Sequence, residues 1–300
     1  MTRNPDFFII GAMKCATTTL HDQLALQPGF RMSNPKEPNF FSDDENWANG
    51  LDWYRSLFSG ADENTLCGES STHYTKLPDF PHTIERMRDF VDGHTKFIYI
   101  IRHPIDRLVS HYVHEWSEVV VSEPIDRAVE LYPRFVDYSR YAMQIGPYLD
   151  EFGPDRVLLV FFERLVRESQ QELERVCDFL DYGSDPHWVV GSSRQNNSDV
   201  RLRKTALVKF VRAVPRLKSA VQSVVPQRAQ NMLKDRLRMN KPPTLGEKQM
   251  VRLVSVFDED LLRLGKWIGT ELNCANFKSI ASRTSPVWDM SKLERALAFK

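Results

Sequence analysis

Short apolar runs alternate with amphipathic stretches along this chain. Apolar runs bounded by turn residues are typical of strands covered on both faces, and a period of three to four residues is typical of helices. Strands are predicted at residues 7–10, 65–70, 95–101 and 156–162, and helices at 17–27, 81–90, from 104 onward, between 113 and 148, at 164–180 and at 244–265. This alternation predicts a single α/β domain with a central parallel sheet flanked by helices. The domain is expected over residues 1–275, and residues 276–300, which lack a clear period, are expected to form a mobile or packing C-terminal tail.

The turn after the first strand is the first candidate binding site. The strand is followed by Gly11-Ala12-Met13-Lys14-Cys15-Ala16, and Thr17 and Thr18 open the next helix. This order places free backbone N–H groups at a helix N-terminus, where the helix dipole adds positive potential. Lys14 adds a cation and the threonine hydroxyls are donors, which predicts a P-loop-like phosphate cradle. The glycine–lysine order of nucleoside-triphosphate P-loops is missing, and a plain turn with a solvent-facing lysine is the alternative.

A stiff loop carries the second candidate. Two prolines flank Lys36-Glu37, which excludes a helix and favours an extended conformation. Phe40 and Phe41 are expected to anchor this loop to the core. The Glu37 carboxylate is a candidate general base, and a surface ion pair on a connector is the alternative.

Polar residues also follow the second and third predicted strands. His73 lies just beyond residue 70, at the kind of strand exit that lines the ligand crevice of open α/β sheets; it is a candidate base or a turn cap. Arg102 follows the third strand and precedes Pro104, the expected first residue of a helix. Its guanidinium suits a phosphate, with Ser110 as a second ligand, unless Arg102 pairs with a neighbouring carboxylate. One bisphosphorylated ligand would explain both Lys14 and Arg102.

Positive charge is concentrated late in the chain. Residues 201–241 hold twelve Lys or Arg against the single acid Asp235, a local net charge of +11 in a chain whose formal net charge is zero. Such a block suits a membrane surface, a nucleic acid, an acidic substrate or simply solvated helix faces. Arg201 and Arg203, next to the polar loop at 191–199, are the ones predicted to reach a ligand.

The composition is that of an ordinary globular protein. Its 300 residues, 42% hydrophobic, are enough for one large α/β core. The four cysteines, Cys15, Cys67, Cys177 and Cys274, show no metal spacing and no disulfide framework, so reduced thiols and a cytoplasmic location are expected. No signal peptide and no apolar run of the ~18 residues that span a bilayer are found, so a soluble protein is expected unless a leader has been removed.

Taken together, the motifs resemble the sulfotransferases that use 3′-phosphoadenosine 5′-phosphosulfate (PAPS), the type that includes heparan sulfate sulfotransferases and their bacterial relatives. Residues 11–18 resemble that family's 5′-phosphosulfate loop, 101–112 its 3′-phosphate motif, 36–41 its loop with the catalytic glutamate and 68–74 the next strand exit, in correct order over roughly residues 6–270. Cys15-Ala16 replaces a glycine pair that is common in the family. Ser70 stands where heparan-type members often have a lysine, which weakens the inference of a polyanionic glycosaminoglycan acceptor.

The resemblance implies in-line transfer of the sulfuryl group of PAPS, the co-substrate, to a hydroxyl of a carbohydrate or small molecule, without a metal. Positioning and charge stabilisation would supply most of the catalysis. Lys14 would neutralise the leaving phosphate, and Glu37, kept ionised by Lys36, would take the acceptor proton, with His73 as second choice. The nucleotide ligands implied are the N–H groups of residues 14–18, including Cys15 and Ala16, the hydroxyls of Thr17 and Thr18, and Arg102 with Ser110.

Two other functions stay open. A kinase with an atypical phosphate loop predicts Mg²⁺-dependent turnover and an acid at a strand end, where this chain has Arg102. A non-enzymatic binder that uses residues 201–241 predicts salt-sensitive binding that does not need Lys14. No nucleic-acid partner is expected; membrane-surface contact, the oligomeric state and the acceptor are left open.

Overall fold

The computed structural model describes residues 3–191, 201–202, 238–239 and 243–297. Residues 1–107, 136–195 and 252–300 form one compact unit, and residues 108–135 and 196–251 form a second. The first unit holds the main sheet and the candidate residues of its strand exits.

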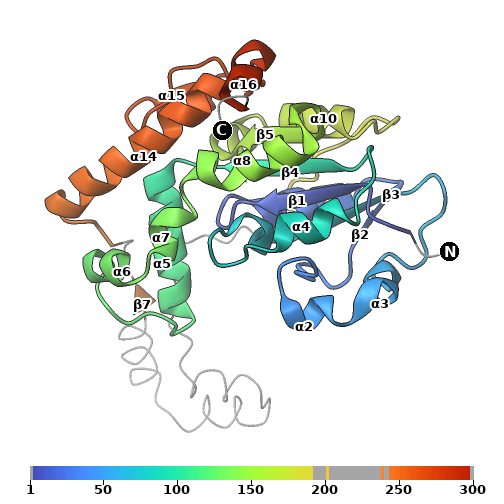
Figure 1. Ribbon diagram of the computed structural model, residues 1–300, viewed down its shortest axis with the longest axis horizontal. Helices are drawn as coiled ribbons and strands as arrows, with labels where there is room; N and C mark the ends of the chain where they lie inside the picture. The colour runs from blue at the N-terminus through green and yellow to red at the C-terminus, as the bar shows by residue number, and fades with distance from the viewer. Residues whose placement is uncertain (1–2, 192–200, 203–237, 240–242, 298–300) are drawn as a thin grey trace, which may run out of the picture. The chain divides into compact units, whose positions relative to one another are not determined.

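Five parallel strands form this sheet in the order β2-β3-β1-β4-β5 (Figure 1). They are β1 Phe7–Gly11, β2 Phe30–Met32, β3 Leu66–Ser70, β4 Lys96–Ile101 and β5 Val157–Phe161. The predicted parallel sheet and its four predicted strands are confirmed. β2 was not predicted, because three residues are too few to show a period. The chain leaves β1 toward β2 and β3 on one side and returns as β4 and β5 on the other, so the ligand crevice is expected at the carboxyl end of β1.

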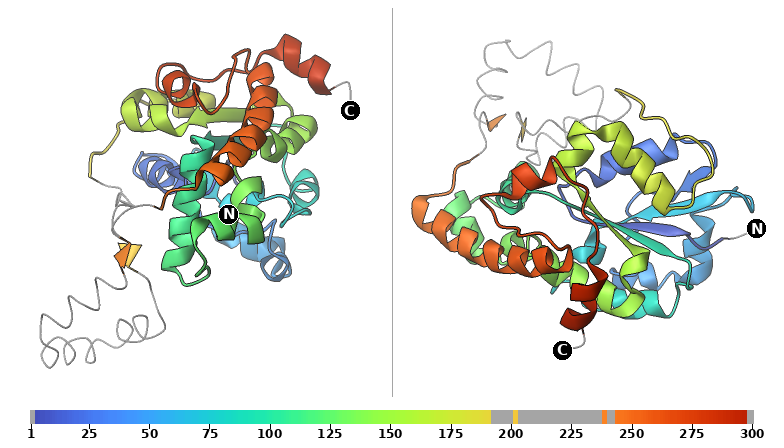
Figure 2. Two further views of the ribbon diagram at one scale, coloured as in Figure 1. Left: turned by 90° about the vertical axis from the view of Figure 1, so that its left-hand side faces the viewer. Right: turned by 90° about the horizontal axis from the view of Figure 1, so that it is seen from above.

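Helices cover both faces of the sheet. In the right-hand view of Figure 2, α1 (Thr17–Ala25) and α10 (Ser169–Phe179) lie on one face, and α4 (Thr83–Arg88) and α8 (Tyr141–Phe152) lie on the other. The other helices of this unit are α2 Asp44–Trp47, α3 Gly50–Ser56, α9 Phe162–Arg167, α15 Phe277–Ala281 and α16 Met290–Leu297, with 3₁₀ turns η1 Thr72–Thr75 and η2 Pro154–Arg156; α7 Arg134–Asp137 lies at the unit boundary.

Neighbouring phenylalanines of β1 lie on opposite faces of the sheet. Successive side chains of a strand point to opposite faces, and Phe7 and Phe8 are both fully buried. The Phe7 ring meets Phe30 edge-on at 5.9 Å, whereas Phe8 stacks on Phe97 at 5.7 Å. Burial on both sides explains why β1 is apolar at every position.

The predicted helix at 164–180 is wrong in one respect, because it is two helices. Glu168 has φ −122° and ψ 52°, which is not a helical conformation, so α9 ends before it and a new helix, α10, begins after it. Helix α10 then packs along β5. The predicted stop after residue 180 is confirmed. Asp181 adopts φ 56°, and the Tyr182 N–H donates to the Cys177 carbonyl oxygen, a left-handed helix end.

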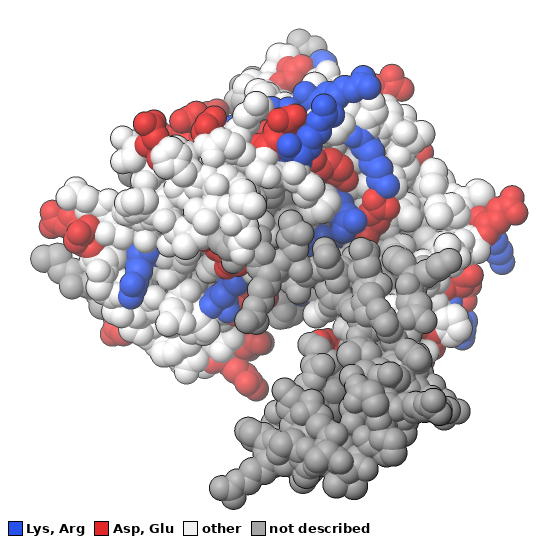
Figure 3. All heavy atoms as spheres, turned by 180° about the vertical axis from the view of Figure 1, so that it is seen from behind, with Lys and Arg blue, Asp and Glu red and all other residues white. Residues whose placement is uncertain are grey.

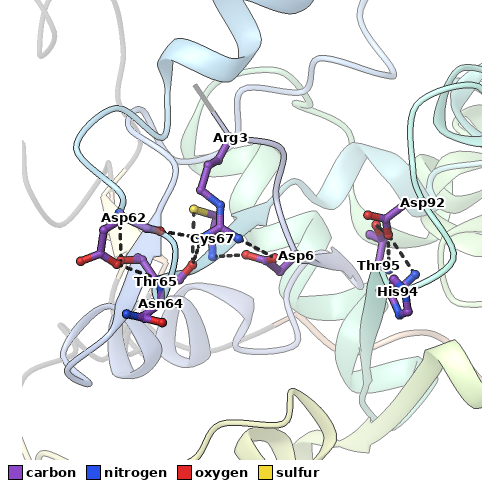
Figure 4. Close-up of polar contacts among 9 residues, drawn as sticks. All are labelled: Arg3, Asp6, Asp62, Asn64, Thr65, Cys67, Asp92, His94 and Thr95. Carbon is purple, nitrogen blue, oxygen red and sulfur yellow. Dashed lines mark hydrogen bonds and ion pairs between the residues drawn. The ribbon is translucent and has the colours of Figure 1, made fainter. Parts of the chain in front are cut away.

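The amino ends of the strands are held by polar side chains, shown in Figure 4. Arg3 donates to the Asp62 carbonyl oxygen at 2.6 Å and pairs with Asp6 at 3.2 Å. The Asp6 carboxylate in turn accepts from the Cys67 N–H at 2.6 Å, which ties β1 to β3, and Asp92 closes the turn that precedes β4. These contacts fix the sheet at the end remote from the strand exits.

The described part of the expected C-terminal tail packs against the sheet. Phe277, Ala281 and Leu293 belong to the same buried cluster as β1 and β5. The Trp288 indole N–H donates to the Val157 carbonyl oxygen at 2.6 Å. Residues 277–293 therefore contribute to the core.

The second unit contains α6 Ile125–Leu131 and the antiparallel pair β6 Arg201–Leu202 with β7 Arg238–Met239. Helix α5 (Pro104–Ser117) enters it from the first unit, and α14 (Glu247–Trp267) leaves it. The Gly246 N–H donates to both carboxylate oxygens of Asp126, at 2.9 and 3.2 Å, so an aspartate of α6 caps α14.

Positive and negative side chains balance in number and are mixed on the surface (Figure 3). On the face shown in Figure 3, Lys and Arg side chains are interspersed with Asp and Glu. Most of the basic segment 201–241, including Arg203, and most of the polar loop 191–199 lie outside the described residues. Within the described ranges, no helix combines the length and the apolar character needed to cross a membrane.

Candidate active site

Three neighbouring strand exits carry the predicted site residues. β1 lies between β3 and β4 in the parallel sheet, so their carboxyl ends meet at one edge. Lys14 follows β1, His73 follows β3 and Arg102 follows β4. The loop that carries Glu37 also reaches this edge, because the Glu37 N–H donates to the Ser70 carbonyl oxygen at 3.1 Å.

The turn after β1 has the conformation of an anion cradle. Lys14 and Ala16 both lie in the left-handed region, at φ 73° and 65°. The Ala12 N–H donates to Ile100 at 2.7 Å, which joins the start of the turn to β4, and the Cys15 N–H closes the turn on Ala12 at 3.1 Å. Ala16 is the N-cap of α1, and no side chain caps this helix. Its first-turn N–H groups are therefore available to an anion.

Glycine is required at the end of β1. A Cβ atom on Gly11 would lie 2.0 Å from the Thr75 hydroxyl oxygen. That hydroxyl donates to the Ile10 carbonyl oxygen at 2.8 Å and cannot move without losing the bond. The absence of a side chain thus lets η1 close against the phosphate turn.

A buried positive charge lies behind the turn. Arg107 is fully buried, and its Nε donates to Ser139 Oγ at 2.5 Å. Burial raises the pKa of the Cys15 thiol to about 12, although the charges of Arg107 and Arg102 oppose this rise. The thiol is therefore neutral, and the two guanidinium groups add positive potential at the turn.

Arg102 lies at the β4 exit and forms no ion pair with a carboxylate among the residues that the structure describes. Its guanidinium carbon lies 4.7 Å from the centre of the Phe162 ring, and its Nε is buried without a hydrogen bond among the described residues. Glu163 is near, but its Oε1 accepts from the His103 N–H at 2.9 Å. Burial raises the pKa of Glu163, and Arg102 acts against the rise. A buried, unsatisfied guanidinium N–H at a strand exit is suited to an anionic ligand.

The predicted base Glu37 lies next to the predicted cation Lys36. Lys36 Nζ is 2.7 Å from Glu37 Oε1. His73 lies within electrostatic reach of the Glu37 carboxylate. Burial lowers the pKa of His73 to about 4, and its ring stacks on Phe80 at 4.5 Å. The structure thus brings the two candidate bases together, with the imidazole neutral at neutral pH.

Sequence reasoning missed a second histidine at this place. His21, on α1, is 7% exposed, and its Nδ1 has no hydrogen bond within the described ranges. Burial lowers its pKa to about 4; the Lys36 charge adds to this effect and the Glu37 charge opposes it. Its position four residues after Thr17, on the same helix face, was a signal that could have identified it.

The buried carboxyl group of Glu69 was also missed. It is fully buried at the β3 exit, and burial raises its pKa to about 7 although the hydroxyls of Ser71, Tyr54 and Tyr74 oppose the shift. Burial of a carboxylate in a strand costs free energy unless hydrogen-bond partners are present. That cost was the available signal in the sequence.

Two of the predicted ligands belong to the second unit. Ser110 lies on α5 in the second unit, and Arg201 lies in β6. Thr17 is buried and Thr18 is exposed at the start of α1. The described residues contain no group of three or more His, Cys, Asp or Glu side chains that could hold a metal ion.

The fold and this edge together define an α/β protein with a candidate anion site at the ends of β1 and β4. Residues 4–213 match the model of the sulfotransferase domain, and the chain belongs to the sulfotransferase family. The family resemblance expected from the motifs is thereby confirmed.

Known proteins of this family are similar over different shares of their length. Mouse heparan sulfate glucosamine 3-O-sulfotransferase 3A1 is 32% identical over 189 residues, 59% of this chain and 45% of the mouse protein. Human heparan sulfate glucosamine 3-O-sulfotransferase 6 is 32% identical over 187 residues, 59% of this chain and 52% of the human protein. The chain thus spans about half the length of the curated relatives it matches. A sulfotransferase from Alicyclobacillus acidocaldarius shares the fold, with a TM-score of 0.64 at 23% identity over 90% of this chain and 98% of that one.

Proposed function

We propose that this protein transfers the sulfuryl group of PAPS to an acceptor hydroxyl. One observation carries the proposal: an uncapped helix N-terminus follows β1, and after the neighbouring strand β4 comes an arginine whose buried Nε has no hydrogen bond within the described ranges. Two cationic exits on adjacent strands suit a nucleotide with phosphates at both ends. Membership of the sulfotransferase family supports the sulfate donor over the ATP of a kinase.

The chemical roles follow from the places of these groups. The sulfur–oxygen bond to the 5′-phosphate breaks while a bond from the acceptor oxygen to sulfur forms, and adenosine 3′,5′-bisphosphate leaves. Lys14 neutralises the charge that develops on the leaving phosphate oxygen. The N–H groups of residues 14–18 hold the 5′-phosphate, and Arg102 holds the 3′-phosphate.

Glu37 is proposed to take the proton of the acceptor hydroxyl. Its side chain is partly exposed, and its Oε1 lies 2.7 Å from the Lys36 ammonium nitrogen, on a loop that is bonded to the β3 exit through the Glu37 N–H. His73 is the second choice, because a half-buried neutral imidazole with a pKa of about 4 is a weak proton acceptor.

The acceptor is proposed to be a hydroxyl of a carbohydrate or a small molecule. The named relatives act on glucosamine of heparan sulfate, which supports a carbohydrate. Ser70, buried at the β3 exit, supplies no cation there, which argues against a highly sulfated polymer.

The first prediction concerns Lys14. Lys14→Ala should lower the rate of transfer from ³⁵S-labelled PAPS about 10²- to 10³-fold, because an electrostatic group acting on the transition state is lost. Binding of adenosine 3′,5′-bisphosphate, measured by calorimetry, should persist. Lys292→Ala is the matched control, since that lysine is exposed and pairs with Asp289 away from the strand exits. Transfer at the parental rate in Lys14→Ala would rule out the catalytic role.

The second prediction separates the two candidate bases. Glu37→Gln keeps the shape and removes the base, so kcat should fall by about 10²-fold or more. His73→Phe keeps the ring that stacks on Phe80 and should lower kcat by less than about tenfold. The opposite order of losses would make His73 the base. If both variants keep full activity in the absence of Mg²⁺, neither Glu37 nor His73 is the base. PAPS would still be supported as the sulfate donor.

We also propose that the protein resides in the cytoplasm. All four cysteines are free thiols, and Cys15, Cys67 and Cys177 are buried, which suits a reducing compartment. Cell fractionation with an antibody to the chain tests this, and recovery in a secreted fraction would contradict it.

A further inference from the structure

The loop 36–41, here called the base loop, is attached to the β3 exit through alternate backbone N–H groups. The Glu37 N–H donates to the Ser70 carbonyl oxygen at 3.1 Å. The Asn39 N–H donates to Ser71 Oγ at 3.1 Å, and the Phe41 N–H donates to the Tyr74 hydroxyl at 3.4 Å. Two of these three contacts therefore depend on side-chain hydroxyls.

One buried carboxyl group binds both hydroxyls. Ser71 Oγ donates to Glu69 Oε1 at 2.6 Å, and the Tyr74 hydroxyl is close enough to Glu69 to lower the pKa of its carboxyl group. A hydroxyl has one proton to donate. When this proton points at the carboxylate, only lone pairs face the base loop, so Glu69 orients both hydroxyls as acceptors for the loop's N–H groups.

The base loop needs these contacts because its backbone is strained. Glu37 and Asn39 lie in the left-handed region, at φ 57° and 51°, which is unfavourable for a residue with a side chain. Such conformations persist where the surroundings impose them. Without the hydroxyl contacts, the backbone at Glu37 is expected to relax and the carboxylate to move.

Tyr54 provides an internal comparison. Its hydroxyl also donates to Glu69, on Oε2, and it is as deeply buried as Tyr74. Among the described contacts, however, its hydroxyl reaches no N–H group of the base loop. Loss of the Tyr54 hydroxyl removes a partner of Glu69, whereas loss of the Tyr74 hydroxyl also removes an acceptor for the loop.

We propose that Glu69 is a positioning residue that holds the base loop, and with it the Glu37 carboxylate, in the reactive place through the hydroxyls of Ser71 and Tyr74. The inference rests on the proposed function for its effect on catalysis. Its structural part, the hold on the loop, stands on the contacts alone.

The test compares Tyr74→Phe with the matched control Tyr54→Phe in the full chain. Hydrogen exchange of the peptide that covers residues 36–42 should become at least about fivefold faster in Tyr74→Phe and remain near the parental rate in Tyr54→Phe. With ³⁵S-labelled PAPS and 4-nitrophenyl glycosides as acceptor probes, kcat should fall about ten- to hundredfold in Tyr74→Phe only. The Kd of adenosine 3′,5′-bisphosphate should stay within about twofold in both.

Two more variants extend the test. Ser71→Ala should behave like Tyr74→Phe. Glu69→Gln should lie between Tyr74→Phe and Tyr54→Phe, because an amide can accept from one hydroxyl but must donate to the other. Equal exchange rates and equal kcat losses in the two tyrosine variants would overturn the proposal, since the carboxyl group would then act only through stability. If no form transfers sulfate but all bind the nucleotide, the proposed function fails, and the exchange rates still decide whether Glu69 holds the loop.

Discussion

The two histidines next to Glu37 are neutral in the folded protein at neutral pH. Burial lowers the pKa of His21 and His73 from 6.5 to about 4. In the unfolded chain these side chains take up a proton near pH 6.5. The folded form therefore binds fewer protons between these values, and their contribution to stability is complete above pH 6.5 and is lost as the pH falls toward 4.

The lowered pKa of His21 gives a prediction for the pH dependence of stability. His21→Leu should reduce the loss of unfolding free energy between pH 7 and pH 5, because the leucine does not titrate. Urea midpoints at the two pH values measure the effect. His82→Leu is the control, since His82 is exposed. An unchanged pH dependence in His21→Leu would show that the histidine is not buried as a neutral group.

Residues that act through distant partners escaped sequence reasoning. Lys14, Glu37 and Arg102 were predicted as site residues because each belongs to a local pattern, which is a strand end or a proline-flanked loop. Glu69 and His21 matter through contacts with residues 71, 74 and 36–37. No short pattern encodes these contacts.

At the scale of an element, the phosphate turn is built with alanine where glycine is less strained. Ala16 has φ 65°, and the left-handed region costs a residue with a side chain about 1–2 kcal/mol. Glycine avoids this cost but loses about 0.5–1 kcal/mol of backbone entropy on folding. Ala16→Gly should therefore leave the unfolding free energy unchanged or raise it by up to about 1.5 kcal/mol.

Ala12→Gly is the matched control for that substitution. Ala12 is buried and does not have a positive φ, so glycine should lower the unfolding free energy by about 1 kcal/mol. Denaturant melts of both variants measure the difference. A loss in Ala16→Gly as large as in Ala12→Gly would contradict the left-handed conformation at residue 16.

Element types were predicted better than element ends. Strands at 7–10, 95–101 and 156–162 were found because a strand buried on both faces is largely apolar. The strand at 65–70 was found although it ends in the polar residues Glu69 and Ser70. The break at Glu168 was missed, since both halves keep their apolar positions on one helical face. The contact of Asp126 with the start of α14 was also missed, because that aspartate belongs to another helix.

At the scale of the whole molecule, the segment after residue 276 should be required for stability. Phe277→Ala removes a fully buried ring from the main core cluster and should lower the unfolding free energy by about 3–5 kcal/mol. Val287, 72% exposed, is the control, and Val287→Ala should change it by less than about 0.5 kcal/mol. Thermal melts decide, and equal melting temperatures for the two variants would show that the segment is dispensable.

Phe7 and Leu293 belong to one buried cluster, and this has a consequence for synthesis in the cell. A ribosome translates β1 long before Leu293, so that part of the cluster stays uncovered until residues 277–293 have been made. During this time the nascent chain exposes apolar surface that these residues later bury, and such surface promotes aggregation. A stop codon shortly before residue 277 should therefore direct the product to aggregates or to proteases.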